Sequence, residues 1–365
     1  MHEKYMRRCF DLARLGAQTA SPNPLVGAVI VHENVIIGEG FHHTRGEAHA
    51  EVNAIAAVSE ADKGRIRAST IYISLEPCSH QGLTPPCTDL ILANGIKHVV
   101  ISAVDPNPEV SGKGIAGLRA NDVSVVAGVL EEEGNQLIGN FKNAMTEHRP
   151  YLILKFVQSS DRYIGHPDYQ VWLSNGFEKV LVHKLRSEVD GIMVGTNTVL
   201  VDNPQLTNRE YFGNDPVRIT FDRNRRIPSD FHILDGSIPT LVYTAETDQN
   251  TTQPDTEGTA RQHASGIVQS GITGAQHPEF VSISFDEKML HHCLKDLIKR
   301  NIQSVLVEGG ASLINSFVKQ NLWDEAWVVT TNHVLSQGVK APLLNGNLVQ
   351  KFSLDMDEIQ VIKRI

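Results

Sequence analysis

Hydrophobic and polar positions alternate along residues 1–128 with two different periods. An apolar stripe at helical spacing covers residues 2–18, and shorter helical patterns occur at 48–59, 88–94 and 114–120. Between them lie short apolar runs that predict strands, at residues 26–31, 35–38, 69–75, 98–103 and 123–128. Strands that alternate with helices are typical of an α/β sandwich with parallel strand pairing.

A second series of strands and helices follows residue 150. Residues 130–148 are charged and are expected to be helical up to Arg149, because a residue that precedes proline avoids the helical region. Beyond that break, apolar runs predict strands at residues 151–157, 191–195, 217–221, 240–244, 281–284, 304–308 and 326–331. Helices are predicted at residues 177–188, 288–299 and 312–320, and a surface loop at 246–278. The break therefore predicts two α/β domains, residues 1–147 and 148–365.

Composition and charge narrow the class of protein. The chain has 365 residues, enough for two cores, and 33 Lys and Arg against 42 Asp and Glu give a net charge of −9. This balance lacks the basic excess that nucleic-acid binding requires. No apolar run approaches the roughly 20 residues that cross a membrane, the N-terminus lacks a signal-peptide pattern, and four cysteines are too few for a disulfide scaffold. We therefore expect a cytoplasmic protein with no nucleic-acid or membrane partner.

A metal-binding pattern lies in the first half. His49 and Glu51 open a predicted helix, and two Pro-Cys pairs end at Cys78 and Cys87. One His and two Cys supply the three protein ligands of a catalytic zinc, which keeps a fourth position for water. Glu51 cannot share the direction of His49 on a helix, so it is free to act on that water as a general acid and base. This order of His, Glu and two Cys is the zinc deaminase signature.

The spacing of the two cysteines points to a particular family. Eight residues separate Cys78 from Cys87, more than in the usual nucleoside deaminase signature. Residues 76–87 closely resemble the deaminase half of the bifunctional riboflavin-biosynthesis deaminase/reductase family, and residues 21–27, 40–51 and 105–114 do so too. The resemblance implies a cytidine-deaminase-like α/β/α sandwich and a substrate that is a diaminopyrimidinone carrying phosphoribosylamine. It also implies three substrate contacts, from Asn23, His42 and His80.

One position in this half departs from the family pattern. Leu83 stands where the family commonly has Lys or Arg, so one charged contact to substrate is missing there.

The second half carries a different set of candidate residues. It has no G-x-G-x-x-G motif, which argues against a Rossmann domain. Instead, the apolar run 304–308 leads into Gly309 and Gly310 and then a helix, a turn that lets backbone N–H groups approach a phosphate, although such a pair often marks only a tight turn. Residues 195–207 combine a strand end with a Thr-rich loop.

These stretches resemble the reductase domain of the same family, which has a dihydrofolate-reductase-like α/β fold and uses NADPH. The resemblance implies NADPH contacts from Trp172, Ser174, Thr198, Asp202 and Gly310. It implies substrate contacts from Arg186, Leu206, Arg209 and Glu308. Considered without the resemblance, the arginines are equally consistent with surface salt bridges and Trp172 with a core aromatic. Arg162 and Gln170 depart from the family pattern, which has Gly and Ser there.

The two halves together predict a bifunctional enzyme of riboflavin biosynthesis with Zn²⁺ and NADPH as cofactors. Hydrolytic deamination of the pyrimidine would precede reduction of the ribosyl group to ribityl. The resemblance also implies a homo-oligomer. Three alternatives stay open: a zinc deaminase with a degenerate second domain, a reductase with a structural first domain, and a non-enzymatic binding protein.

Overall fold

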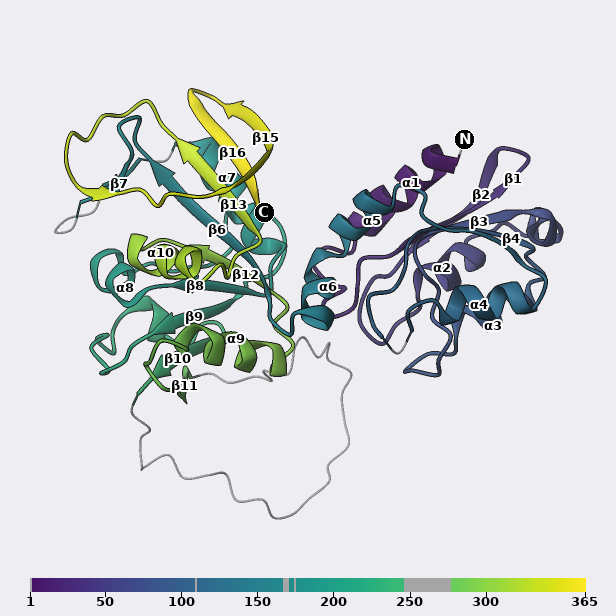
Figure 1. The fold of residues 1–365 in the computed structure, drawn as a ribbon, viewed down its shortest axis with the longest axis horizontal. Coiled ribbons are helices and arrows are strands. Elements are labelled where there is room, and N and C mark those ends of the chain that lie inside the picture. Colours follow the sequence, from purple (N-terminus) through teal and green to yellow (C-terminus); the bar gives the residue numbers. More distant parts are fainter. Residues whose placement is uncertain (1, 109, 167–170, 174, 246–276) are drawn as a thin grey trace, which may run out of the picture. The chain divides into compact units, whose positions relative to one another are not determined.

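The computed structural model describes residues 2–108, 110–166, 171–173, 175–245 and 277–365 (Figure 1). The chain divides into two compact units, Met1–His148 and Arg149–Ile365. The loop predicted at residues 246–278 lies almost wholly outside the described residues. No helix in the described part of the chain is long and apolar enough to cross a membrane.

A five-stranded mixed sheet forms the centre of the first unit. Its strands are β1 (Gly27–His32), β2 (Val35–Phe41), β3 (Thr70–Leu75), β4 (His98–Ala103) and β5 (Ser124–Val126), in the order β2-β1-β3-β4-β5. Only β3, β4 and β5 pair in parallel. The prediction of parallel pairing is wrong for β1, which is antiparallel to both neighbours. Glu33 and Asn34 both have positive φ, the conformation of a tight two-residue hairpin turn, so β2 must return beside β1.

Helices cover both faces of this sheet. They are α1 (His2–Arg14), α2 (Ala50–Ala56), α3 (Cys87–Ala93), α4 (Lys113–Ala120), α5 (Glu131–Leu137) and α6 (Gly139–Thr146), with a 3₁₀ turn η1 at Lys63–Ala68. Adjacent residues of β1 point to opposite faces: Val29 packs under α1, and Ile30 packs toward α2 and α3. Figure 1 shows α1 and α5 on one side and α2, α3 and α4 on the other, so the unit is the expected α/β/α sandwich.

The second unit is built on a nine-stranded sheet in the order β11-β10-β9-β8-β12-β6-β13-β16-β15. Its strands are β6 (Tyr151–Gln158), β8 (Gly191–Val194), β9 (Val217–Phe221), β10 (Thr240–Thr244), β11 (Glu279–Ser282), β12 (Ser304–Glu308), β13 (Glu325–Thr330), β15 (Gly346–Leu354) and β16 (Asp357–Arg364). Pairing is parallel from β11 to β13 and antiparallel from β13 to β15. Short strands β7 (Tyr163–Gly165) and β14 (Val339–Lys340) pair separately.

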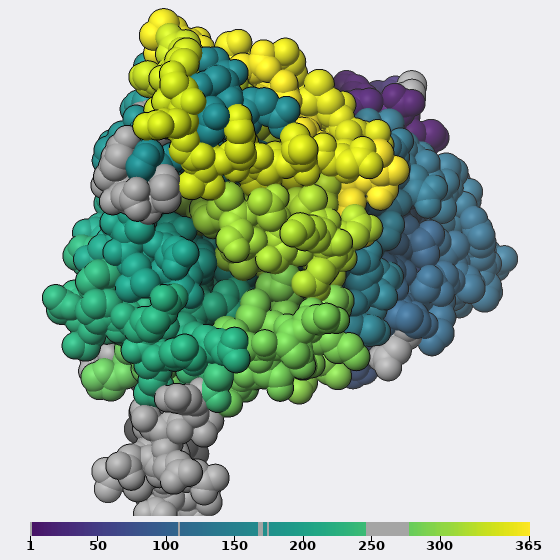
Figure 2. Space-filling view, turned by 60° about the vertical axis from the view of Figure 1, so that its left-hand side comes forward, coloured from purple at the N-terminus to yellow at the C-terminus, as the bar shows by residue number. Residues whose placement is uncertain are grey.

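Both faces of this sheet are covered around its middle strands. The helices are α7 (Gly176–Ser187), α8 (Thr196–Asp202), α9 (Met289–Lys299) and α10 (Ala311–Lys319), with a 3₁₀ turn η2 at His232–Leu234. Leu297 of α9 and Phe317 of α10 pack in the larger core, while Val199 of α8 packs in a smaller one on β8. In Figure 2 the beginning of the unit (teal) and its end (yellow) share one part of the surface, because β6 lies beside β13.

Candidate active sites

The three predicted metal ligands of the first unit come together. His49 is the residue before α2, Cys78 follows β3, and Cys87 begins α3. The Nδ1 atom of His49 lies 3.6 Å from Cys78 Sγ and 3.3 Å from Cys87 Sγ. A tetrahedral zinc ion holds a sulfur and a nitrogen ligand roughly 3.5 Å apart. The donor atoms present therefore fit zinc.

Neighbouring groups orient these ligands. The second ring nitrogen of His49, Nε2, lies 3.3 Å from the Thr84 hydroxyl, which leaves Nδ1 to face the sulfurs. Hydrogen bonds from the Cys87 side chain, from His49 and from the Cys87 backbone N–H, the last at 3.3 Å, lower the pKa of the Cys78 thiol below its usual value. A thiolate is the form that binds metal.

Glu51 lies in the first turn of α2 and is buried. Burial raises the pKa of its carboxyl above the usual value. A carboxyl that holds its proton more readily is suited to take a proton from water and to pass it on.

These residues open on a cavity of about 310 Å³ that also contains the predicted substrate contacts Asn23, His42 and His80. Asn23 Nδ2 lies 2.9 Å from His42 Nε2, and His42 Nδ1 lies 3.1 Å from the Ala48 carbonyl oxygen. Burial lowers the pKa of His42, so the ring is neutral, donating from Nδ1 and accepting at Nε2. Leu83 is at the rim with 78% of its surface exposed.

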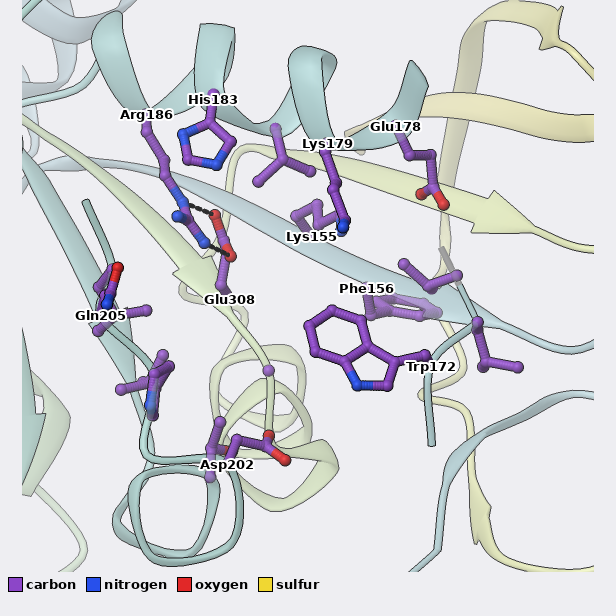
Figure 3. A pocket seen from close by; sticks show the side chains of 18 of the residues that line it. Lys155, Phe156, Trp172, Glu178, Lys179, His183, Arg186, Asp202, Gln205 and Glu308 are labelled. Atoms are coloured by element: carbon purple, nitrogen blue, oxygen red, sulfur yellow. Dashed lines mark hydrogen bonds and ion pairs between the residues drawn. The ribbon is translucent and has the colours of Figure 1, made fainter. Parts of the chain in front are cut away.

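A second cavity, of about 550 Å³, lies in the second unit (Figure 3). It brings together most of the residues proposed for cofactor and substrate, which come from the segment before α7, from α7, α8 and β12, and from the loops after α8 and β12. These are Trp172, Arg186, Thr198, Asp202, Leu206, Arg209, Glu308 and Gly310. Ser174 and Gln170 lie outside the described residues.

The turn after β12 has the conformation that glycine favours. Gly309 and Gly310 have φ of +88° and +78°, and a Cβ on Gly310 would lie 3.1 Å from the Thr198 hydroxyl. The turn therefore packs closely against α8. Residues 196–202 were expected to be a loop, but they form this helix, because Val199 is buried against Ile192 and Val194 of β8.

Arg186 and Glu308 form a largely buried ion pair that lines this cavity (Figure 3). Nε of Arg186 donates to Glu308 Oε1 at 2.9 Å, Nη2 donates to Oε2 at 2.7 Å, and Nη1 donates to the Thr207 carbonyl at 2.8 Å. Although burial favours the neutral acid, Arg186 holds the pKa of Glu308 below its usual value. Arg186 thus fixes both Glu308 and the loop that carries Leu206 and Arg209.

Trp172 is not a core aromatic, since 68% of its surface is exposed. The Lys179 ammonium lies 5.5 Å from the centre of its ring. Asp202 is also exposed at the cavity, so both side chains are accessible to a ligand.

Sequence reasoning gave no role to Lys155, which lines this cavity from β6 and is only 9% exposed. Its charge contributes to the lowered pKa of Glu308. A lysine inside the apolar run 151–157 was the available signal, because a charged residue in a buried strand needs a partner or a function.

Arg162 departs from the family's glycine and still adopts the conformation that glycine favours, with φ of +67°. Its backbone N–H donates to the Ser159 carbonyl at 2.9 Å. Asp161 beside it accepts hydrogen bonds from the Ser159 hydroxyl and from the backbone of Leu335 and Ser336. The loop therefore keeps a closed turn with arginine in this position.

Replacing Arg186 with Ala is expected to destabilise the second unit by about 3 kcal/mol, because it leaves the Glu308 carboxylate buried without its partner. Urea unfolding of the two proteins measures the difference.

This stabilisation depends on pH. The ion pair contributes fully above the pKa of Glu in the unfolded state, about 4.3, and its contribution disappears as the pH falls through the lower pKa of Glu308 in the folded state. The difference should thus shrink at acid pH. The double variant Arg186→Met, Glu308→Gln should recover part of the lost free energy of unfolding. If Arg186→Ala and the unsubstituted protein were equally stable at pH 7, the ion pair would not stabilise the fold.

Comparison with known proteins identifies the family. Residues 150–364 match the family model described as RibD C-terminal domain, and residues 1–103 match the cytidine and deoxycytidylate deaminase zinc-binding region. The riboflavin biosynthesis protein RibD of Aquifex aeolicus is 34% identical over 92% of this chain and 88% of its own length. The chain belongs to the RibD family. The RibD protein of Bacillus amyloliquefaciens is 37% identical over 89% of this chain and 83% of its own length.

A solved structure agrees with this assignment across both units. The crystal structure of a diaminohydroxyphosphoribosylaminopyrimidine deaminase/5-amino-6-(5-phosphoribosylamino)uracil reductase from Thermotoga maritima is 32% identical, with a TM-score of 0.85. The match covers 100% of this chain and 99% of the Thermotoga maritima chain. This RibD family member is therefore an enzyme of riboflavin biosynthesis, with a zinc-binding deaminase domain and a reductase domain.

Proposed function

We propose that the first unit hydrolyses the C2 amino group of 2,5-diamino-6-(5-phosphoribosylamino)pyrimidin-4(3H)-one to give 5-amino-6-(5-phosphoribosylamino)uracil and ammonia. The second unit then reduces the ribosyl group of that product to ribityl with NADPH. The observation that carries the proposal is the cluster of His49, Cys78 and Cys87, which lies at a cavity lined by His49, Cys78 and the buried carboxyl of Glu51. Matches to the deaminase and RibD models in this order support both steps.

In the first unit, His49, Cys78 and Cys87 would hold zinc, which supplies a Lewis acid for activating water. Glu51 would take one proton from the attacking water as the water oxygen bonds to C2, and would deliver it to the ring nitrogen. It would then pass the proton of the resulting hydroxyl to the leaving amine. Water and the amino group thus become the carbonyl oxygen and ammonia. Asn23, His42 and His80 would position the pyrimidine from the cavity wall.

In the second unit, Trp172, Thr198, Asp202 and the Gly310 turn would contact NADPH, which supplies a hydride. Ser174 is proposed for the same set. Arg186, Leu206, Arg209 and Glu308 would contact the substrate. An open-chain or imine form of the sugar is the natural hydride acceptor, and the reduced group must also gain a proton. We propose Lys155, a buried lysine on the cavity wall, as the donor of this proton.

The test uses the full, zinc-loaded chain with the aminouracil as substrate and follows NADPH absorbance, with NADH as the comparison. We expect oxidation of NADPH that depends on the aminouracil. Ammonia release from the diaminopyrimidinone without such oxidation would favour the alternative of a deaminase with a degenerate second unit. The match over residues 150–364 and the intact second cavity give that alternative no support.

We also infer a homo-oligomeric enzyme in the cytoplasm, where its four cysteines, all free in this structure, would stay reduced. Light scattering of the purified chain tests the oligomer. A mass of one chain, about 40.2 kDa, would contradict it.

A further inference from the structure

A tight turn presents Arg45 at the rim of the deaminase cavity. The backbone N–H of Glu47 donates to the Thr44 carbonyl at 3.1 Å, and Gly46 has φ of +85° at the third position of this turn. Both ends of the segment are held, because Asn53 Nδ2 donates to the Phe41 carbonyl at 2.8 Å and to the Ala48 carbonyl at 3.3 Å. The position of the Arg45 backbone is thus defined by the fold.

The guanidinium at this turn is available to a ligand. Arg45 is exposed and lines the cavity, and it makes no hydrogen bond or ion pair within the described part of the chain. Other arginines of the first unit, such as Arg7 and Arg8, pair with carboxylates.

Charge is distributed unevenly in this cavity. Its acidic groups, Glu51, Glu76 and Asp105, are buried, and Glu76 accepts three backbone N–H bonds. Among the described residues that line it, Arg45 is the only lysine or arginine. An anionic ligand group is therefore attracted to the rim, where this guanidinium lies.

We propose that Arg45 binds the 5-phosphate of the deaminase substrate, so that it determines the preference of the first unit for a phosphorylated pyrimidine. This inference rests on the proposed function, which places the pyrimidine ring beside the metal ligands and Glu51. The ring lies deep in the cavity, and the phosphoribosyl group extends toward the opening. Arginine suits this role because its planar fork of donors matches two phosphate oxygens.

The neighbouring position offers a way to restore the charge. Leu83 Cδ1 lies 3.9 Å from where a Cβ on Gly46 would be, so its side chain is next to the Arg45 turn. Leu83 is 78% exposed, and a lysine there needs no buried space. A cation at residue 83 is thus close enough to replace the one lost from residue 45.

The experiment compares deamination of the phosphorylated diaminopyrimidinone with that of its dephosphorylated form, in the full zinc-loaded enzyme. For Arg45→Ala we expect a roughly tenfold rise in KM for the phosphorylated substrate, an unchanged KM for the other, and little change in kcat. The rise should diminish at high salt, because an exposed ion pair is screened. Arg67→Ala, at an exposed arginine of η1 away from the cavity, is the matched control.

Adding Leu83→Lys to Arg45→Ala should lower the KM for the phosphorylated substrate again. An equal effect of Arg45→Ala on both substrates, or no effect on either, would overturn the role of Arg45 while deamination itself continues. Failure of the unsubstituted enzyme to release ammonia from either substrate would instead overturn the proposed function. These outcomes are distinguishable within one set of assays.

Discussion

The Glu51→Gln enzyme is expected to bind zinc normally, but its kcat for deamination should fall by roughly 10² to 10⁴-fold. This is the usual contribution of a positioned general acid and base. An amide has the same shape as the carboxyl but cannot take a proton from water. Glu51 is not among the three ligand residues, so metal content should be unchanged. Ammonia release and zinc analysis on the same preparation measure both effects.

Reduction provides the internal control for this variant. The candidate reductase residues lie in the other unit, so aminouracil-dependent NADPH oxidation should proceed at the unsubstituted rate. Glu47→Gln is the matched control, because Glu47 is an exposed glutamate four residues before Glu51 and does not line the cavity. Parallel loss of both activities in Glu51→Gln would contradict the independence of the two units.

The Cys87→Ser variant should lose zinc and unfold more readily in its first unit. Changing a residue that hydrogen-bonds to a metal ligand lowers metal affinity by up to about a hundredfold. Loss of a ligand atom itself should lower it further. A metal present at about 100 times its Kd contributes about 2.7 kcal/mol of stability, and this contribution would disappear. Zinc content and the unfolding temperature of the first unit are the measurements.

Cys293→Ser makes the same chemical change at a buried cysteine in the second unit. Any loss of stability there should leave zinc content and deamination intact. If Cys87→Ser retained stoichiometric zinc, the assignment of Cys87 as a ligand would be wrong.

The cluster of His49, Cys78 and Cys87 could be predicted from sequence because the pattern that indicates it is local. The residues that position its ligands, a strand end and two helix starts, are adjacent to the ligands in the chain. The strands 98–103, 217–221, 240–244 and 304–308 were likewise predicted with the bounds found, since continuous apolar runs mark buried parallel strands.

Features that depend on distant contacts could not be predicted in this way. Strand β15 at the sheet edge is mostly exposed, so it has no apolar run. The Arg186–Glu308 pair joins residues 122 positions apart, and no local pattern distinguishes a buried pair from two surface charges. The first three residues of helix α8, Thr196, Asn197 and Thr198, are weak helix formers. The helix is stabilised by the packing of Val199 against β8, which is not visible in the local sequence.

The order of the strands determines when each unit can complete its sheet during synthesis. The sheet of the first unit is complete once residue 126 has emerged from the ribosome. In the second unit, β6 is made first but lies between β12 and β13, so its first neighbour is missing until residue 308 has been translated and its second until residue 330. An apolar strand that waits this long for its partners is exposed to aggregation. Chaperone dependence of the nascent chain should therefore begin after residue 150, when the zinc-binding unit already has all its strands.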